Sequence, residues 1–259
     1  MPSILEDPTT TLPPPKTALQ ASQTLTPRTS HLKDGTPVTL YPIANGPQSI
    51  PADLVALLHR EFSAEIKAGC TYPMEEPMTL ERFAEYWFGT FAVVAVLGEE
   101  GLVEGRDWEK ECLGTFYIKP NYPGLYSLFF WDGAWSAGFW VIADLVYLCT
   151  GRCSHVCNAG FLTTVAARGR GVGIVMGETY LQFAPKLVSS LFFCCHYLVF
   201  MYVYGYKYSV FNLVFENNVA SVKIWERLGF KIIGRVPGAA RLANSEELVD
   251  ALIIGRELV

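Results

Sequence analysis

The sequence predicts a mixed α/β fold, and three observations support that prediction. Short runs of β-branched and aromatic residues alternate with amphipathic segments of helical period. One predicted strand, at 158–165, leads through a glycine-rich loop directly into an apolar helix. The chain contains no internal repeats. We therefore expect a single sheet with helices packed against it.

The predicted elements follow from the spacing of the apolar residues and from the helix-capping residues. In chain order they are a strand at 38–41, helices near 52–68 and 80–88, strands at 91–97 and 113–118, the strand, glycine loop and helix that begin at 158, a strand at 207–215, a helix at 218–228, and closing strands near 231–236 and 249–255.

Composition limits the protein's organisation and its partners. Residues 1–35, rich in Thr, Pro and Ser, are expected to form a disordered tail, and they lack an apolar signal core and an Arg-rich targeting pattern. Residues 36–259 then make one domain. The net charge of −5 argues against a nucleic-acid partner. Seven cysteines without a paired framework favour a reducing compartment, the cytoplasm, with mitochondria as the alternative.

Two apolar inserts, 125–150 and 188–203, interrupt this domain. The first has only Asp132 and Asp144 as acidic or basic residues, and the second has none besides His196. We interpret both as translated introns, because a pyrimidine-rich intron read in frame yields Phe, Leu, Ser, Tyr, Cys and Val. Membrane attachment is the competing interpretation, since the first insert is long enough to span a bilayer. Its two aspartates argue against membrane attachment. Ordered apolar loops of this length are rare in compact domains.

The glycine-rich loop, Arg168-Gly169-Arg170-Gly171-Val172-Gly173, suits a pyrophosphate. Glycines let the backbone approach a ligand, and the first amides of the following helix are unpaired donors at its positive end. A loop that merely starts a helix is the plain alternative. Downstream, Ala220, Ile224 and Leu228 recur at helical spacing, Asn218 can cap that helix, and Gly229 can end it.

The two motifs together resemble the GNAT superfamily of N-acetyltransferases, in which an Arg/Gln-x-x-Gly-x-Gly/Ala loop holds the pantetheine-pyrophosphate and an Asn-led helix ending in Leu-Gly-Phe follows. Further strings resemble fungal N-acetyltransferases that act on L-azetidine-2-carboxylate and related proline analogues. These strings are Thr71-Tyr72-Pro73, Tyr86-Trp87-Phe88, 113–122, Arg152-Cys153-Ser154-His155, 157–161 and 205–215. The likeness covers roughly 50–124, 151–187 and 205–258.

The resemblance implies a mixed, mostly antiparallel central sheet flanked by helices, with two strands splayed apart to admit acetyl-CoA. It also implies acetyl-CoA as co-substrate, a small imino or amino acid as substrate, protection against toxic proline analogues or oxidative stress, and a homodimer. An enzyme of this kind needs no metal. Cys153, His155 and Cys157 lack distant partner ligands, so we expect no zinc site there.

Amide formation needs a neutral amine and a donor for the developing oxyanion, which backbone amides near 161–165 can supply. Direct attack is therefore favoured, and Cys157 is expected to be a buried structural residue. Asn158 and Asn212 are the predicted catalytic and substrate-binding residues, with Phe161 beside them. Their amides can contact a carboxylate and a secondary amine without adding charge. A turn or cap role is the plain alternative for both asparagines.

The resemblance assigns the cofactor contacts to Leu162, Thr163, Val165, Arg168, Gly169, Arg170, Gly171, Val172, Gly173, Asn218, Ser221 and Trp225. Trp225 stands where many superfamily members carry an acid tyrosine, and indole is no acid near neutral pH. The general acid is thus unassigned, with Tyr206 and Tyr208 as candidates. The base is equally open, because Glu216 and His155 are more readily explained as solvated or core residues.

Two functional classes remain in play. The first is an active N-acetyltransferase. The second is a membrane-associated or inactive relative, in which the apolar inserts disrupt the enzyme. The two differ in one structural respect, because an enzyme needs both slot-forming strands in register, whereas insert 188–203 directly precedes one of them.

Overall fold

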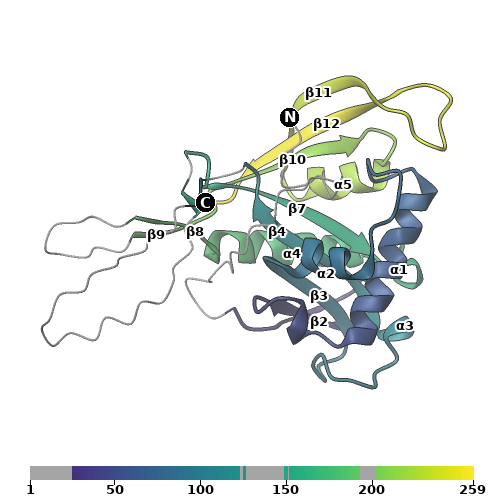
Figure 1. The fold of residues 1–259 in the computed structure, drawn as a ribbon, viewed down its shortest axis with the longest axis vertical. Coiled ribbons are helices and arrows are strands. Elements are labelled where there is room, and N and C mark those ends of the chain that lie inside the picture. The colour runs from purple at the N-terminus through teal and green to yellow at the C-terminus, as the bar shows by residue number, and fades with distance from the viewer. Residues whose placement is uncertain (1–24, 123–124, 127–148, 151, 193–201) are drawn as a thin grey trace, which may run out of the picture.

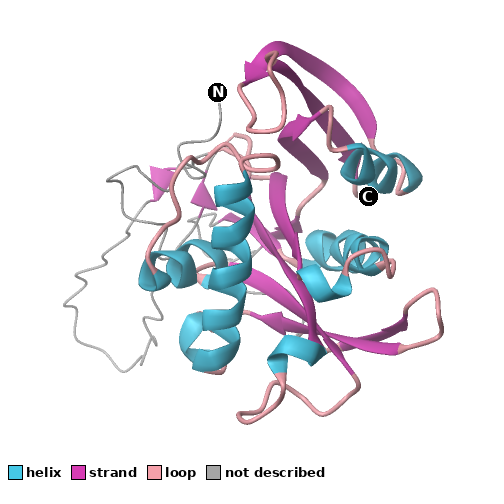
Figure 2. Ribbon diagram, turned by 90° about the vertical axis from the view of Figure 1, so that its right-hand side faces the viewer, coloured by secondary structure: helices cyan, strands magenta, loops and turns pink. Residues whose placement is uncertain are grey.

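The computed structural model describes residues 25–122, 125–126, 149–150, 152–192 and 202–259. Its main feature is an eight-stranded sheet with helices on both faces (Figures 1 and 2). In spatial order the strands are β1 (Arg28–His31), β2 (Pro37–Ile43), β3 (Phe91–Leu97), β4 (Cys112–Pro120), β7 (Val156–Thr163), β10 (Tyr208–Phe215), β12 (Val249–Glu257) and β11 (Lys231–Ala240). Neighbours are antiparallel except for β7 and β10, so the expected mixed, mostly antiparallel sheet is confirmed.

The helices are α1 (Ala52–Ala68), α2 (Leu80–Phe88), α3 (Trp108–Glu111), α4 (Val172–Phe183) and α5 (Val219–Arg227), with 3-10 turns at Pro47–Ser49, Val165–Ala167 and Ala184–Lys186. Local signals fix the ends of the longer ones. The Thr79 side chain accepts a hydrogen bond from the Arg82 amide at the start of α2, and Gly69 ends α1 in the left-handed conformation (φ 63°).

Two hydrophobic cores lie on opposite faces of the sheet, and β3 shows how they are divided. Phe91, Val93 and Ala95 face the core under α4 and α5, whereas the alternate residues 92, 94 and 96 face the core under α1 and α2. Because successive strand side chains point to opposite faces, a continuous apolar run fits a strand covered on both sides. This explains why β3 reads as an unbroken hydrophobic segment.

The prediction of a disordered tail at 1–35 is wrong for residues 28–31. Residues 28–31 form β1, which pairs with β2 through a turn closed by the Leu32 amide and the Thr36 carbonyl at 2.9 Å. Leu32 is buried, and Gly35 supplies the positive φ that the turn needs. Polar composition at 28–31 hid a strand that is fixed by pairing rather than by its own propensity. Residues 1–24 lie outside the described part of the chain.

Both inserts leave and re-enter the fold at a single point. Strand β5 (Leu125–Tyr126) pairs with β6 (Cys149–Thr150), and β8 (Val188–Phe192) pairs with β9 (Tyr202–Gly205). Each pair is a separate two-stranded ribbon, so neither insert contributes a described strand to the main sheet. Strands β7 and β10 keep their places despite the inserts. The remainder of each insert, 127–148 and 193–201, lies outside the described residues, as does most of the segment considered as a membrane span.

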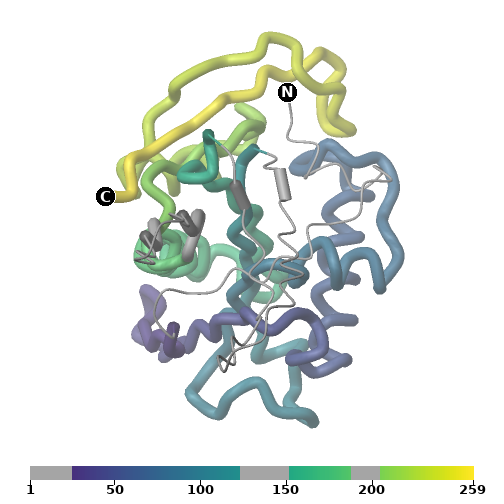
Figure 3. The backbone as a smooth tube through the Cα atoms, turned by 60° about the vertical axis from the view of Figure 1, so that its left-hand side comes forward, coloured from purple at the N-terminus to yellow at the C-terminus, as the bar shows by residue number. Residues whose placement is uncertain are grey.

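Among the helices that the structure describes, none combines the length and the apolar character needed to cross a bilayer. At the end of the sheet opposite β1, strands β11 and β12 form a long two-stranded arm along the edge of the molecule (Figure 3). Strand β11 is one of the two edge strands of the sheet, and most of its side chains are exposed.

Strands β4 and β7 approach each other closely at Gly114. A Cβ at this position (φ 155°) would lie 2.4 Å from the Leu162 carbonyl oxygen, which belongs to the β7 backbone and cannot move aside alone. We expect Gly114→Ala to lower the free energy of unfolding by roughly 2–5 kcal/mol, combining left-handed strain with overpacking.

The control for this substitution is Gly98→Ala, where φ is also positive (73°) but no atom lies within 4 Å of the added Cβ. It should lower the free energy of unfolding by about 1–2 kcal/mol, from backbone strain alone. Urea unfolding measures both variants. Equal losses would show that the close approach of β4 and β7 is not rigid.

Candidate active site

The candidate site lies where β7 and β10 part. Their parallel pairing is limited to Tyr208 with Val156 and Ser209 with Cys157, after which the strands diverge. The expected splay is therefore confirmed. Beyond the parting lies a cavity of about 460 Å³, lined by both strands, by α5 and by the segment between α1 and α2.

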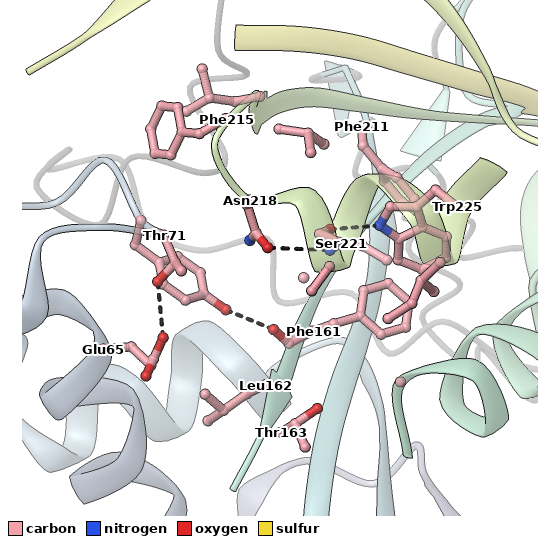
Figure 4. A pocket seen from close by; sticks show the side chains of 18 of the residues that line it. Glu65, Thr71, Phe161, Leu162, Thr163, Phe211, Phe215, Asn218, Ser221 and Trp225 are labelled. Carbon is pink, nitrogen blue, oxygen red and sulfur yellow. Dashed lines mark hydrogen bonds between the residues drawn. The ribbon is translucent and has the colours of Figure 1, made fainter. Parts of the chain in front are cut away.

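Aromatic rings fill the base of the gap between the two strands. The Trp225 ring of α5 lies 4.7 Å from the Phe161 ring and 4.6 Å from the Phe211 ring, between centroids. The indole N–H donates to the Ser221 hydroxyl at 3.1 Å (Figure 4). The Trp225 side chain therefore packs between β7 and β10. Its indole N–H already donates a hydrogen bond within α5.

The open edge of β7 presents backbone amides to the cavity. The Val156 carbonyl accepts from the Asn121 amide, 2.9 Å away at the end of β4, so Val156 faces β4. Because backbone groups of successive residues point to opposite edges, those of Phe161 and Thr163 face the parting from β10. The Phe161 carbonyl accepts a hydrogen bond from the Tyr72 hydroxyl at 2.9 Å, and Tyr72 also lines the cavity.

The glycine loop lies at the wide end of this slot. Gly169 (φ 76°) and Gly171 (φ 90°) both adopt the left-handed conformation, and Gly171 is the N-cap residue of α4. A Cβ on Gly169 would meet no atom within 4 Å, so that side of the loop is open. Gly173 allows α5 to approach, since a Cβ there would lie 2.8 Å from the Ile224 Cδ1 atom.

Acidic residues of α1 hold the loop. Glu65 forms an ion pair with Arg168 and accepts a hydrogen bond from the Thr71 hydroxyl at 3.0 Å. One turn earlier, the Glu61 carboxylate accepts from the Val165 amide at 2.8 Å. Arg170 pairs instead with Asp34 of the β1–β2 turn at 3.6 Å. The loop is therefore fixed from two sides by segments distant in sequence.

The structure brings most of the predicted site residues to one cavity. Those that line it are Asn158, Phe161, Leu162, Thr163, Arg168, Gly173, Asn212, Asn218, Ser221 and Trp225. The other predicted contacts, Val165, Gly169, Arg170, Gly171 and Val172, lie in the loop and the first turn of α4 but not in the cavity wall. Val172 is buried in the core under α4, and Val165 is exposed.

The two predicted asparagines lie on opposite walls. Asn158 is buried at the parting, with its Oδ1 accepting from the Ala159 amide at 2.7 Å. Asn212 on β10 exchanges two side-chain hydrogen bonds with the buried Asn121, at 2.6 and 3.3 Å. Asn218 caps α5 by accepting from the Ser221 amide at 3.2 Å, so its capping role is real.

None of the four sequence-based candidates for general acid or base lines this cavity. Tyr206, Tyr208 and His155 belong to the region where β7 and β10 begin, and Glu216 forms a two-pronged ion pair with Arg235 on the surface. The sequence interpretation missed four ionisable residues that do line the cavity, namely Glu65, Tyr72, Tyr86 and Tyr117. The matched strings contained the three tyrosines, but nothing local assigned them a role.

Cys157 is fully buried, where its sulfur lies 3.1 Å from the Tyr180 hydroxyl. Burial raises the pKa of this thiol to about 12, so it stays protonated at neutral pH and is no nucleophile. In the described parts of the chain, no three His, Cys, Asp or Glu side chains gather as a metal site.

The raised pKa predicts the reactivity of Cys157. At pH 8 its thiolate fraction is on the order of a thousandfold below that of an ordinary thiol, so iodoacetamide should label the exposed Cys153 and spare Cys157. Peptide mass spectrometry measures both sites, and labelling in urea serves as the control in which both react. Equal labelling of the folded protein at both cysteines would contradict the assignment.

Comparison with known proteins places this site in a family. No model of a known protein family matches the chain. N-acetyltransferase aca1 of Schizosaccharomyces pombe is 33% identical over 208 residues, covering 78% of this chain and 78% of that protein. Protein SPT10 of Saccharomyces cerevisiae is 28% identical, and the alignment covers 90% of this chain but only 36% of SPT10.

Solved structures show the same fold. A GCN5-related N-acetyltransferase from Kribbella flavida superposes with a TM-score of 0.56 at 23% identity, over 84% of this chain and 97% of that one. A GNAT superfamily phosphinothricin acetyltransferase from Sinorhizobium meliloti, solved in complex with acetyl-CoA, superposes with a TM-score of 0.53 at 10% identity, over 90% and 89% of the two chains. The splayed strands, the glycine loop and the relationship to aca1 agree, and the chain belongs to the GNAT superfamily of N-acetyltransferases.

Proposed function

We propose that this enzyme transfers the acetyl group of acetyl-CoA to the amine of a small imino or amino acid, of which L-azetidine-2-carboxylate and other proline analogues are the models. One observation carries the proposal. A single cavity joins the glycine loop, at Arg168 and Gly173, to the asparagines Asn158 and Asn212 along the open edge of β7. The acetyl-CoA complex of the phosphinothricin acetyltransferase of the same fold supports this co-substrate.

In this proposal the glycine loop receives the pyrophosphate. The first amides of α4 are donors without partners inside the helix, and the helix dipole favours an anion there. Arg168, half exposed beside Glu65, adds a positive charge at the mouth of the cavity. The pantetheine arm then lies along β7, where the amides of Phe161 and Thr163 face the slot.

The amine substrate occupies the narrow end. Asn158 and Asn212 offer uncharged amides to its carboxylate and nitrogen, and the Phe161 and Phe211 rings supply an apolar wall for a small ring. A carboxylate near the amine would stabilise the protonated, unreactive form of the amine, whereas an amide does not. The two asparagines therefore orient the amine without stabilising its protonated form.

The reaction is a direct transfer. The neutral amine attacks the thioester carbonyl, whose oxygen becomes negative and is stabilised by backbone amides of β7. Collapse of the tetrahedral intermediate breaks the carbon–sulfur bond and releases the thiolate of CoA. Cys157 takes no part, because it is buried and protonated. Trp225 cannot protonate the thiolate, because indole is only a donor.

The first test measures CoA release from acetyl-CoA with L-azetidine-2-carboxylate, for the full chain and for a chain lacking residues 125–150 and 188–203. Because the insert ends pair with each other outside the main sheet, the shortened chain should fold and turn over. Turnover by the shortened chain alone supports the intron interpretation. Acetyl-CoA binding without turnover in either chain would overturn the amine assigned here.

Asn212→Asp tests recognition of the substrate carboxylate. The added negative charge should repel it and should lower kcat/KM at least about tenfold, or about 1.4 kcal/mol, while acetyl-CoA affinity stays the same. Asn217→Asp is the matched control, because Asn217 lies exposed, with its amide 3.4 Å from Asn244. Steady-state kinetics against the amine measures both. An equal effect of the two substitutions would remove Asn212 from the substrate site.

A further inference from the structure

The proposed reaction requires a group that takes a proton from the amine, and the cavity offers few. Among the described residues that line it, Glu65 is the only carboxylate, and it is already engaged by Arg168 and Thr71 at the loop end. The remaining ionisable groups are Arg168 itself and three tyrosine hydroxyls. The proton acceptor therefore has to be sought among the tyrosines.

Two of these tyrosines form a pair beside the parting of the strands. The hydroxyl groups of Tyr86, on α2, and Tyr117, on β4, lie 3.1 Å apart. Tyr117 is the cross-strand partner of Gly160 on β7, and a Cβ on Gly160 would lie 2.7 Å from the Tyr117 hydroxyl oxygen. The glycine thus lets this hydroxyl lie directly over the strand on which Asn158 and Phe161 stand.

A buried cation lies against both rings. The Lys119 Nζ atom is 3.8 Å from the Tyr86 ring centroid and 4.1 Å from that of Tyr117, and it donates to the Tyr86 carbonyl oxygen. Lys119 is 6% exposed and pairs with Asn158 across β4 and β7. A positive charge fixed next to two phenol rings favours negative charge on their oxygens. The aromatic rings packed against the pair, Phe62 and Trp87, are uncharged.

The third tyrosine shows the contrast. The Tyr72 hydroxyl donates its proton to the Phe161 carbonyl, and burial raises the pKa of Tyr72 further above its ordinary range, with Tyr86 and Glu65 adding to the effect. Tyr72 consequently keeps its proton. Because a charge on Tyr86 raises the pKa of Tyr72, ionisation of one of these tyrosines disfavours ionisation of another. By elimination, the Tyr86–Tyr117 pair is the remaining candidate among the lining residues for a group that exchanges a proton with the substrate.

We propose that the Tyr86–Tyr117 pair, with Lys119 as its counter-charge, is the proton acceptor and donor of the acetyl transfer. The inference rests on the proposed function, and it supplies the acid that Trp225 cannot. In the reactive form of the enzyme the pair holds one negative charge before the amine attacks. As the amine nitrogen bonds to the thioester carbon, its N–H proton passes to the pair. When the carbon–sulfur bond breaks, the pair gives that proton to the departing thiolate, yielding the amide and CoA thiol.

A tyrosinate titration tests the pair without any substrate. Near-ultraviolet absorbance should show one tyrosine of the wild-type protein ionising at least about one pH unit below the ordinary value near 10. Tyr117→Phe should abolish that step, Lys119→Met should move it to higher pH, and Lys119→Arg should restore it. Tyr41→Phe is the control, because the Tyr41 hydroxyl accepts from the Gly101 amide away from the cavity. A wild-type titration without an early step overturns the proposal.

The second test compares the steady-state kinetics of the wild-type protein and of Tyr117→Phe as a function of pH. Tyr117→Phe should lower kcat about a hundredfold or more and should remove the acid limb of the pH profile of kcat, with KM for acetyl-CoA unchanged. An unaltered pH profile would reduce the pair to a packing role. If the wild-type protein does not bind acetyl-CoA, the proposed function is refuted. The tyrosinate titration would still show whether the Tyr86–Tyr117 pair ionises.

Discussion

The parting of β7 from β10 is the constraint on which the rest of the molecule depends. Two neighbouring strands that are paired for only two residues would normally close along their length, because unpaired backbone groups are costly when buried. Here the rings of Phe161, Phe211 and Trp225 occupy the gap at its base. The unpaired amides beyond them face a cavity, where a ligand can satisfy them.

The remaining architecture keeps that gap from collapsing. Strand β7 is fixed along its other edge by seven consecutive pairings with β4. At Gly114 the two backbones lie so close together that there is no room for a Cβ atom. Strand β10 is held on its far edge by β12, and the register of this pairing shifts between Phe211 and Val214. Each strand is anchored on the side opposite the cavity, so an open site is compatible with a stable sheet.

Sequence patterns predicted the elements better than they predicted the contacts between them. Helices α1 and α2 and strand β3 were expected with the correct limits, because amphipathic period, capping residues and an apolar run are local signals. The splay came from family resemblance. Strand β1 was missed because its pairing with β2 outweighs its polar composition. The pairs Asn121 with Asn212 and Tyr86 with Tyr117 could not be predicted, since they join residues that only the folded sheet brings together.

The paired ends of the inserts have a consequence for how the chain tolerates changes in its gene. Leu125 and Thr150, the two ends of the first insert, are paired neighbours, so one part of the folding cost, the loop-closure entropy between them, depends only slowly on the length of chain that joins them. That cost rises by about 0.6 kcal/mol for each doubling of loop length. Retention or removal of such a segment in the messenger RNA therefore changes this entropic part of the folding cost little.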